Sequence, residues 1–270
     1  MFKLGCFIFS VVLLLSCQRN KQRVKTYAVV SHTRLDDNTA IDFNVVKANL
    51  KKYDGILLGG DLAYLSSKDD SILTYLDRIF DLSSHSTMWA LGNHDYSNIS
   101  LIKKYTNKET YYSFKDGNTL FIVLDTQKDS SKIINEQLIF YNTVLDTTTN
   151  FSSVVVLTHK LIWMRDNHVF EPMIDSVSNG HLGDCNYCIQ QNNFYQDLYP
   201  KLLSLKQNGK QILCIAGDIG FKCKIFEFID SDGIIFLATG IKANQKDNYF
   251  IKLKQNKLRI NYQFLPITDI

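Results

Sequence analysis

The sequence predicts an α/β fold in which two β-sheets pack as a sandwich, and three observations support this prediction. Apolar, β-rich runs alternate with amphipathic helical patterns in the first part of the chain, an order typical of parallel strands joined by helices. Hairpin-like strand pairs follow near the end of the chain. In addition, side chains of metal-ligand type come directly after several of the strands, which places them at one edge of the fold.

Composition and charge limit the class of protein. The chain has 270 residues, of which 45% are hydrophobic and 21% are charged, enough to bury one sizeable core. Its formal net charge is +3, and Lys and Arg are scattered along the sequence instead of clustered. Such a distribution provides no basic patch for nucleic acid, so we expect no nucleic-acid partner.

The N-terminus is predicted to be a lipoprotein signal peptide over residues 1–16. Lys3 precedes an apolar run, Phe7–Leu15, that is too short for a typical membrane span. The following Leu14–Cys17 resembles a bacterial lipobox, in which the cysteine becomes acylated, so Cys17 is the predicted lipidation site. Residues 17–25 would then be a tether that holds the protein on a membrane of the bacterial cell envelope, facing outside the cytoplasm. The alternative is an ordinary secretory signal with an incidental cysteine.

Residues 26–268 are predicted to form a single domain. Its first part reads as strand, helix, strand, helix, strand, at residues 26–30, 41–52, 55–58, 71–80 and 88–91. A hairpin follows at 111–114 and 119–125, with a turn at Asp116–Gly117. The remaining expected elements are a helix at 136–145, a strand at 151–157, a helix at 194–206, a strand at 211–216, and closing strands at 225–229, 234–238, 249–253 and 258–264. The intervening segment, about 161–193, is interpreted as an insertion over the site.

Two short motifs carry the chemistry. Gly59-Gly60-Asp61 and Gly92-Asn93-His94-Asp95 each follow a predicted buried strand. The carboxyl ends of parallel strands form the usual ligand-binding edge of an α/β sheet, so their side chains should converge there. Later strands deliver His159 and Asp218 to the same edge. Oxygen donors beside imidazole suit Zn, Mn or Fe.

Together these motifs resemble those of the calcineurin-like metallophosphoesterases. The resemblance rests on Gly60-Asp61, Gly92–Asp95 and Thr158-His159. The sequence of the predicted hairpin, beginning at Tyr111–Phe114, is also typical of this family and supports the resemblance independently. It implies the two-sheet sandwich, a phosphate mono- or diester as substrate, and one or two divalent transition-metal ions. The implied reaction is attack of a metal-bound water on phosphorus.

The first and last motifs of that family are altered here. His32 stands where the family has an aspartate ligand, and Arg34 stands where it has a histidine ligand. Near the end of the chain, Asp218 and Gly220 stand where the family has two histidines. One imidazole and one carboxylate are therefore exchanged, while two further ligands are lost.

The resemblance implies a role for each matching residue. Nearly a complete ligand shell for one metal ion would be formed by Asp61, Asn93, His159 and Asp218. His32 would either complete that shell or hold a weaker second ion.

The catalytic roles are implied in the same way. Arg34 cannot bind a metal but could grip a phosphate oxygen in place of the missing cation. His94 would protonate the leaving oxygen, with Asp95 orienting its imidazole.

An alternative function is a degenerate relative that binds a ligand, or assists assembly, in the envelope without turnover. The lost ligands favour this alternative, whereas retention of His94-Asp95 favours the enzyme. A single-metal hydrolase of another ester class would share the same site.

The predicted insertion holds further candidates. Trp163, His168 and His181 are candidates for substrate contact. The Cys185–Cys188 pair has three interpretations, namely a structural disulfide, inert thiols, or a metal or redox site that includes His181.

Overall fold

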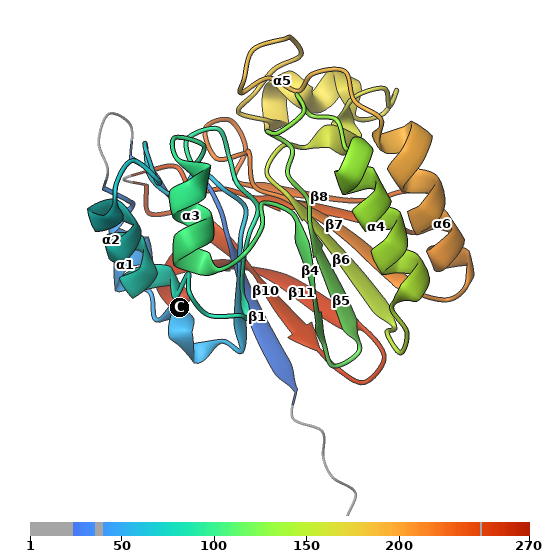
Figure 1. Cartoon of the computed structure of the whole chain (residues 1–270), viewed down its shortest axis with the longest axis horizontal. Coiled ribbons are helices and arrows are strands. Elements are labelled where there is room, and N and C mark those ends of the chain that lie inside the picture. Colours follow the sequence, from blue (N-terminus) through green and yellow to red (C-terminus); the bar gives the residue numbers. More distant parts are fainter. Residues whose placement is uncertain (1–23, 36–39, 244) are drawn as a thin grey trace, which may run out of the picture.

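The computed structural model describes residues 24–35, 40–243 and 245–270, so the predicted signal peptide and Cys17 lie outside the described residues. Two mixed β-sheets face each other, and helices cover the outer face of each (Figure 1). This arrangement confirms the predicted two-sheet α/β sandwich. Within the described residues, no helix has the length and apolar character needed to cross a membrane.

The first sheet has the strand order β11-β10-β1-β2-β3, and the second has the order β4-β5-β6-β7-β9-β8. The strands of the first sheet are β1 (Lys25–Val30), β2 (Gly55–Leu58), β3 (Thr87–Trp89), β10 (Tyr249–Gln255) and β11 (Ile260–Pro266). Those of the second are β4 (Tyr112–Asp116), β5 (Thr119–Val123), β6 (Ser153–Thr158), β7 (Gln211–Ala216), β8 (Ile225–Ile229) and β9 (Ile235–Thr239). The helices are α1 (Phe43–Lys47), α2 (Asp70–Phe80), α3 (Ile99–Thr106), α4 (Asn135–Thr147), α5 (Ile174–Val177) and α6 (Tyr199–Gln207).

Three apolar layers hold these elements together. Alternate residues of a strand point to opposite faces, so each central strand supplies two layers. In β6, for example, Val155 and Leu157 belong to the layer between the sheets, whereas Val154 and Val156 pack outward toward α4 and α6. The outer face of the first sheet packs in the same way against α1, α2 and α3 (Figure 1).

The strand directions match the sequence prediction. β1, β2 and β3 run parallel, and so do β5, β6, β7 and β9. The carboxyl ends of β1, β2, β3, β6 and β7 therefore lie at one end of the sandwich, where the loops after them meet. The closing strands pair as antiparallel hairpins, β8 with β9 and β10 with β11.

The helical predictions differ from the structure at two points. The helix expected at 41–52 is only α1 followed by a 3-10 turn at Leu50–Lys52, because Ala48 is extended (ψ 132°). Helix α3 was not predicted from the sequence; its first turn is capped by the Asn98 side chain, which accepts from the Leu101 N–H. The segment expected to be helical at 194–206 is helical throughout: a π-helical turn, Phe194–Leu198, leads directly into α6, whose first turn contains Pro200, a residue without an N–H to donate.

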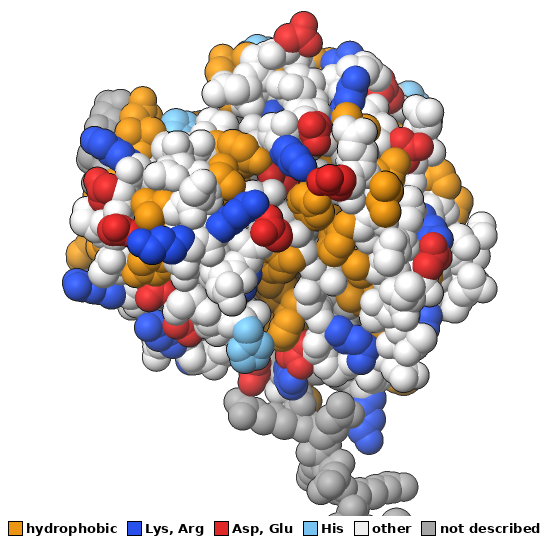
Figure 2. All heavy atoms as spheres, in the orientation of Figure 1, with side chains coloured by type: hydrophobic (Ala, Val, Ile, Leu, Met, Phe, Trp, Pro, Cys, Tyr) orange, Lys and Arg blue, Asp and Glu red, His pale blue; other side chains and the backbone are white. Residues whose placement is uncertain are grey.

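The surface shows mixed charge. On the face drawn in Figure 2, basic and acidic side chains are interspersed and separated by apolar and uncharged groups. No single-sign field is present on that face.

Candidate active site

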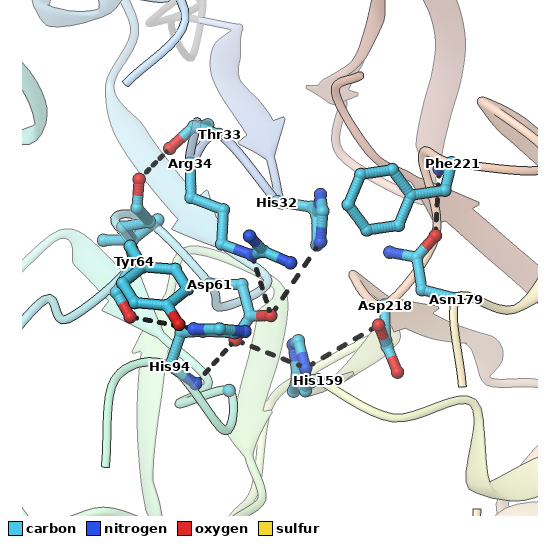
Figure 3. A network of polar contacts seen from close by, with 12 residues as sticks. His32, Thr33, Arg34, Asp61, Tyr64, His94, His159, Asn179, Asp218 and Phe221 are labelled. Carbon is cyan, nitrogen blue, oxygen red and sulfur yellow. Dashed lines mark hydrogen bonds and ion pairs between the residues drawn. The ribbon is translucent and has the colours of Figure 1, made fainter. Parts of the chain in front are cut away.

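Loops from both sheets meet at the carboxyl ends of their strands to form one pocket of about 300 Å³ (Figure 3). The loop after β1 supplies His32 and Arg34, the loop after β2 supplies Asp61, and the loop after β3 supplies Asn93 and His94. From the second sheet, the chain after β7 supplies Asp218, and His159 follows β6 directly. The pocket lining consists of His32, Arg34, Asp61, Asn93, His94, Asn179, Gly180, Tyr187, Asp218 and Phe221.

Backbone contacts fix these loops against one another. The His32 N–H donates to the Gly60 carbonyl over 2.9 Å, and the Asp218 N–H donates to the His159 carbonyl over 2.9 Å. The two sheets approach so closely that a Cβ on Gly217 would lie 2.1 Å from the Gly59 oxygen. Glycine is therefore required at this point of contact.

His32 and Asp61 themselves have left-handed backbone conformations, with φ of 52° and 53°. Non-glycine residues adopt this region at a cost, and such outliers are common at functional sites. Both strained residues point their side chains into the same pocket (Figure 3).

His159 has a defined tautomer. Its Nδ1 lies 2.8 Å from the Gly59 carbonyl oxygen, which can only accept, so Nδ1 carries a proton. In the neutral ring Nε2 is therefore the lone-pair nitrogen. This Nε2 is buried without a hydrogen-bond partner and faces Asp61 Oδ1 at 3.6 Å and Asp218 Oδ1 at 3.9 Å. His159 Nε2 thus lies between the two carboxylates.

This convergence fits a metal ion. Ligand atoms bound to a common ion at about 2.0–2.2 Å lie about 3–4 Å apart, and the distances from His159 Nε2 to the two carboxylates fall in that range. Metal-binding histidines usually donate their other N–H to a backbone carbonyl, as His159 does. The second Asp218 oxygen, Oδ2, is also buried without a hydrogen-bond partner. Asp61, His159, Asp218 and the nearby Asn93 could therefore hold one ion.

The local electrostatics likewise favour positive charge between these groups. Burial lowers the pKa of His159, but the Asp61 and Asp218 carboxylates outweigh burial and raise it above its ordinary value. For Asp61, burial raises the pKa, but His159, His32 and His94 outweigh burial and lower it. Burial and the neighbouring Asp61 raise the pKa of Asp218.

The other oxygen of Asp61 has a different environment. Oδ2 lies 3.8 Å from Arg34 Nε and 3.9 Å from His32 Nε2. His32 lies 3.2 Å from the Ile241 carbonyl through Nδ1, which leaves Nε2 facing the pocket. Burial lowers the pKa of His32 to about 4, with Arg34 adding to this and Asp61 opposing it, so the ring is neutral near pH 7. His32 therefore accompanies Arg34, on the side of Asp61 away from His159.

His94 is oriented by a group that the sequence analysis did not identify. Its Nδ1 lies 2.8 Å from the Tyr64 carbonyl oxygen, and its ring centroid is 5.0 Å from that of Tyr64. The carbonyl can only accept, so Nδ1 carries a proton and Nε2 is the atom available to a ligand. The His94 backbone N–H also donates to Asp61 Oδ1 over 3.1 Å.

The prediction that Asp95 orients His94 is wrong. The Asp95 carboxylate is fully buried and accepts from backbone and side-chain donors, none of which belongs to His94. Its donors are the N–H groups of Asp61, Leu62 and Gly92, the Trp89 indole and the Ser66 hydroxyl. Asp95 therefore joins the Asp61 loop to the Gly92–Asp95 loop, and its acceptor capacity is used there.

The predicted insertion contributes to the pocket through unexpected residues. Asn179, Gly180 and Tyr187 line the pocket, together with Phe221 from the loop after β7. Asn179 Oδ1 accepts from the Phe221 N–H over 2.9 Å. These contacts depend on how loops lie in space, and no local sequence signal indicated them.

Three other insertion candidates lie outside the pocket lining. Trp163 is buried against Phe236 and Phe194 in the core. His168 lines a separate hollow with Glu171 and neighbouring residues. The ring of His181 contacts Tyr187 and not the pocket itself.

The Cys185–Cys188 pair is a disulfide, as one of the three sequence interpretations held. Cys188 is buried. His181 Nε2 lies 3.5 Å from the Cys188 sulfur. The bridge closes a four-residue loop that contains Tyr187.

The fold and the ligand-type side chains at its edge fit a metal-dependent phosphoesterase. The family model for calcineurin-like phosphoesterases matches residues 32–179, more than half of the chain. The chain therefore belongs to the calcineurin-like phosphoesterases, hydrolases of phosphoric esters that use divalent metal ions. A phosphoester substrate fits this family.

The solved structures that resemble this chain are distant in sequence. A dimetal phosphatase from Danio rerio has a TM-score of 0.58 at 13% identity, covering 90% of this chain and 96% of that one. A 5'-nucleotidase precursor from Thermus thermophilus has a TM-score of 0.46 at 12% identity, covering 90% of this chain and 54% of that one. No curated protein gives a significant sequence match. At these identities the first structure supports the fold alone.

Proposed function

We propose that this protein hydrolyses a phosphate mono- or diester with one tightly held divalent transition metal, Mn, Fe or Zn, and that the Arg34 guanidinium replaces a second cation. The metal would be held by Asp61, Asn93, His159 and Asp218. When bound, the ion supplies a water of lowered pKa and neutralises charge on the phosphoryl group.

The observation that carries this proposal is that the two carboxylate oxygens of Asp61 face different groups. Its Oδ1 faces His159 Nε2 at 3.6 Å, whereas its Oδ2 faces Arg34, a permanent cation, at 3.8 Å. A carboxylate in this position could bridge two cations. Here one of the two positions is already next to a positive side chain.

One family ligand for a second ion is replaced on the Arg34 side of the pocket. The family's last ligand position is occupied by Gly220. Gly220 has φ +136°, and a Cβ on it would lie 2.9 Å from the Ile241 oxygen. A histidine at this position would strain the backbone. Among the described residues, the imidazoles that line the pocket are those of His32 and His94.

The remaining roles follow from position. Arg34 would bind a phosphoryl oxygen through its donor fork, and a guanidinium next to Asp61 is suited to balance charge that grows in the transition state. His94, whose Nδ1–H is held by the Tyr64 carbonyl, would act as an imidazolium that gives its Nε2 proton to the leaving oxygen and becomes the neutral ring. Asp95 would position Asp61 through its backbone N–H.

The test is turnover of p-nitrophenyl phosphate and bis(p-nitrophenyl) phosphate by the purified full-length protein loaded separately with Mn²⁺, Fe²⁺ or Zn²⁺. We expect hydrolysis of at least one ester that stops on chelation and resumes on addition of the metal. A matched His94→Ala protein should retain its metal and lose turnover. Absence of turnover with every metal would overturn this proposal and favour the non-catalytic, ligand-binding alternative.

We also propose that the protein is anchored to a membrane of the bacterial cell envelope through lipid on Cys17, with its catalytic domain outside the cytoplasm. The support is the lipobox-like Leu14–Cys17 after a short apolar segment. Cys17→Ala should move the protein out of the membrane fraction or leave its leader uncut. A Cys17→Ala protein that is still processed and still bound to the membrane would refute the anchor.

A further inference from the structure

The active-site pocket has a polar base and an aromatic rim. The base contains the charged and ligand-type side chains described above. Around them lie three aromatic side chains with large exposed fractions, Tyr64 at 38%, Tyr187 at 46% and Phe221 at 37%. Large exposed aromatic side chains beside a site often contact a ligand.

Two of these rings are held by the catalytic side chains. Phe221 meets the His32 ring edge-on with centroids 4.7 Å apart, and Arg34 lies 5.4 Å from the Phe221 centroid. On the other side, Arg34 lies 6.0 Å from the Tyr64 centroid. Figure 3 shows Tyr64 and Phe221 on opposite sides of the Arg34 and His32 side chains. A group bound at Arg34 would therefore have an aromatic face on either side.

The third ring, Tyr187, is presented by a constrained loop. The Cys185–Cys188 disulfide encloses it, the Ile189 N–H donates to the His181 carbonyl over 2.9 Å, and the Tyr187 and His181 rings meet edge-on. A Cβ on Gly180 would lie 2.4 Å from the Tyr187 carbonyl oxygen. Glycine therefore allows this loop to lie directly against the pocket.

We propose that the rim formed by Tyr64, Tyr187 and Phe221 is a subsite for a flat aromatic group, so that the substrates are phosphoesters of an aryl or heteroaromatic alcohol or of a nucleoside. This inference rests on the proposed function, because the phosphoryl group would lie at Asp61, His94 and Arg34. The ester group would extend from there toward the pocket mouth, where the rings are exposed. An apolar wall with a few convergent polar groups is typical of small-molecule sites.

A flat ligand is favoured over a flexible aliphatic one for a physical reason. Stacking on an aromatic side chain strengthens the binding of a planar ring without ordering a chain of rotatable bonds. The rings are also fixed before binding, Tyr187 by its disulfide loop and Phe221 by His32 and by Asn179, which accepts from its N–H. Prepositioned rings reduce the entropic cost of binding.

The test is calorimetric binding of phenylphosphonate and methylphosphonate to the metal-loaded full-length protein. Neither compound contains a hydrolysable ester bond, so the leaving group's own reactivity does not affect the comparison. We expect phenylphosphonate to bind about tenfold more tightly than methylphosphonate. Equal affinities would overturn the proposal.

Variants identify which residues produce the preference. Tyr187→Ala and Phe221→Leu should each reduce it severalfold with little change in methylphosphonate affinity, whereas Tyr187→Phe should retain it. His168→Ala, in a separate hollow, is the matched control and should behave as the native protein does. A preference that survives both Tyr187→Ala and Phe221→Leu would contradict the proposed subsite.

The outcome is separable from that of the proposed function. Phenylphosphonate preference without turnover of any ester would support the subsite while refuting the enzyme. Turnover without aromatic preference would support the enzyme while refuting the subsite. In the Cys185→Ser/Cys188→Ser protein, the phenylphosphonate preference should fall, because Tyr187 loses its constraint, and an unchanged preference would refute the role given to the disulfide.

Discussion

The two oxygens of Asp61 face chemically different halves of one pocket. On the Oδ1 half, His159 Nε2 and the Asp218 carboxylate present acceptors that a cation would satisfy. On the Oδ2 half, the positive charge is part of the chain, because Arg34 Nε lies 3.8 Å away. Under the proposed function, one bridging-type carboxylate would serve a single metal ion, and Arg34 would stand in place of the second cation.

The two halves also differ in how their geometry is maintained. On the second-sheet side, the Asp218 backbone N–H donates to the His159 carbonyl. On the first-sheet side, the Arg34 backbone N–H donates to the Asp61 carbonyl over 3.3 Å. Asp95 supports the first-sheet side by accepting from both the Asp61 and Gly92 N–H groups. We therefore expect a substitution to reduce metal binding, turnover or the free energy of unfolding, depending on which half of the pocket it affects.

Removing the shared carboxylate should have the largest effect. Asp61→Asn keeps the shape of the side chain but removes its negative charge, so both the metal and the balance for Arg34 are lost. We expect a loss of turnover of about 10³-fold or more together with loss of bound metal. Turnover assays and elemental analysis measure both, and Asp175→Asn, at an exposed position of α5, is the matched control for charge. An Asp61→Asn protein that keeps its metal would show that Oδ1 is not a ligand.

Substitution of His94 should reduce turnover without reducing metal binding. We expect His94→Ala to lower kcat by about 10²–10³-fold at unchanged metal content, because a proton donor is lost. His159→Ala should instead release the metal. Elemental analysis of the two proteins side by side distinguishes the roles, and equal metal loss in both would contradict the separation.

Asp95 should affect stability. Asp95→Ala leaves at least three buried N–H donors without their acceptor, those of Asp61, Leu62 and Gly92. Such unpaired groups are costly, and we expect the free energy of unfolding to fall by about 3 kcal/mol. Urea titration followed by circular dichroism measures this. A change below about 1 kcal/mol would mean that these donors find other partners.

Arg34 should have the smallest of these effects. Arg34→Ala should raise KM and lower kcat/KM by about tenfold to a hundredfold, since a charge-assisted contact with phosphate is lost. Arg34→Lys should recover only part of this, because lysine restores the charge but not the planar donor fork. Steady-state kinetics at fixed metal concentration provide the comparison. Full recovery by lysine would reduce the role of Arg34 to that of a point charge.

The positions of the ligand-type residues at the ends of strands could be predicted from the sequence. Apolar runs ending in Gly59-Gly60-Asp61 and Thr158-His159 place ligand-type residues at a common edge, because parallel strands share their carboxyl ends. The structure brings the predicted His32, Arg34, Asn93 and Asp218 to that pocket as well. The exchange of an imidazole and a carboxylate between the first and last family motifs could be recognised from the sequence alone.

Contacts between loops could not be predicted in this way. Asp95 follows His94 in sequence, but its side chain turns inward to the N–H groups of other loops, and the Tyr64 carbonyl holds His94 instead. Tyr187 and Phe221 reach the pocket from segments with no recognisable pattern. The early end of α1 and the π-helical turn before α6 likewise depend on packing and on single residues within otherwise helical stretches.

The number of metal ions held by the native protein tests the central claim most directly. The purified full-length protein, dialysed after loading with Mn²⁺, Fe²⁺ or Zn²⁺, should retain about one ion per chain by elemental analysis. Arg34→His, which exchanges the guanidinium for an imidazole beside His32, should gain capacity for a second ion. Two tightly held ions in the native protein would contradict the account, because Arg34 would then not occupy the place of a cation.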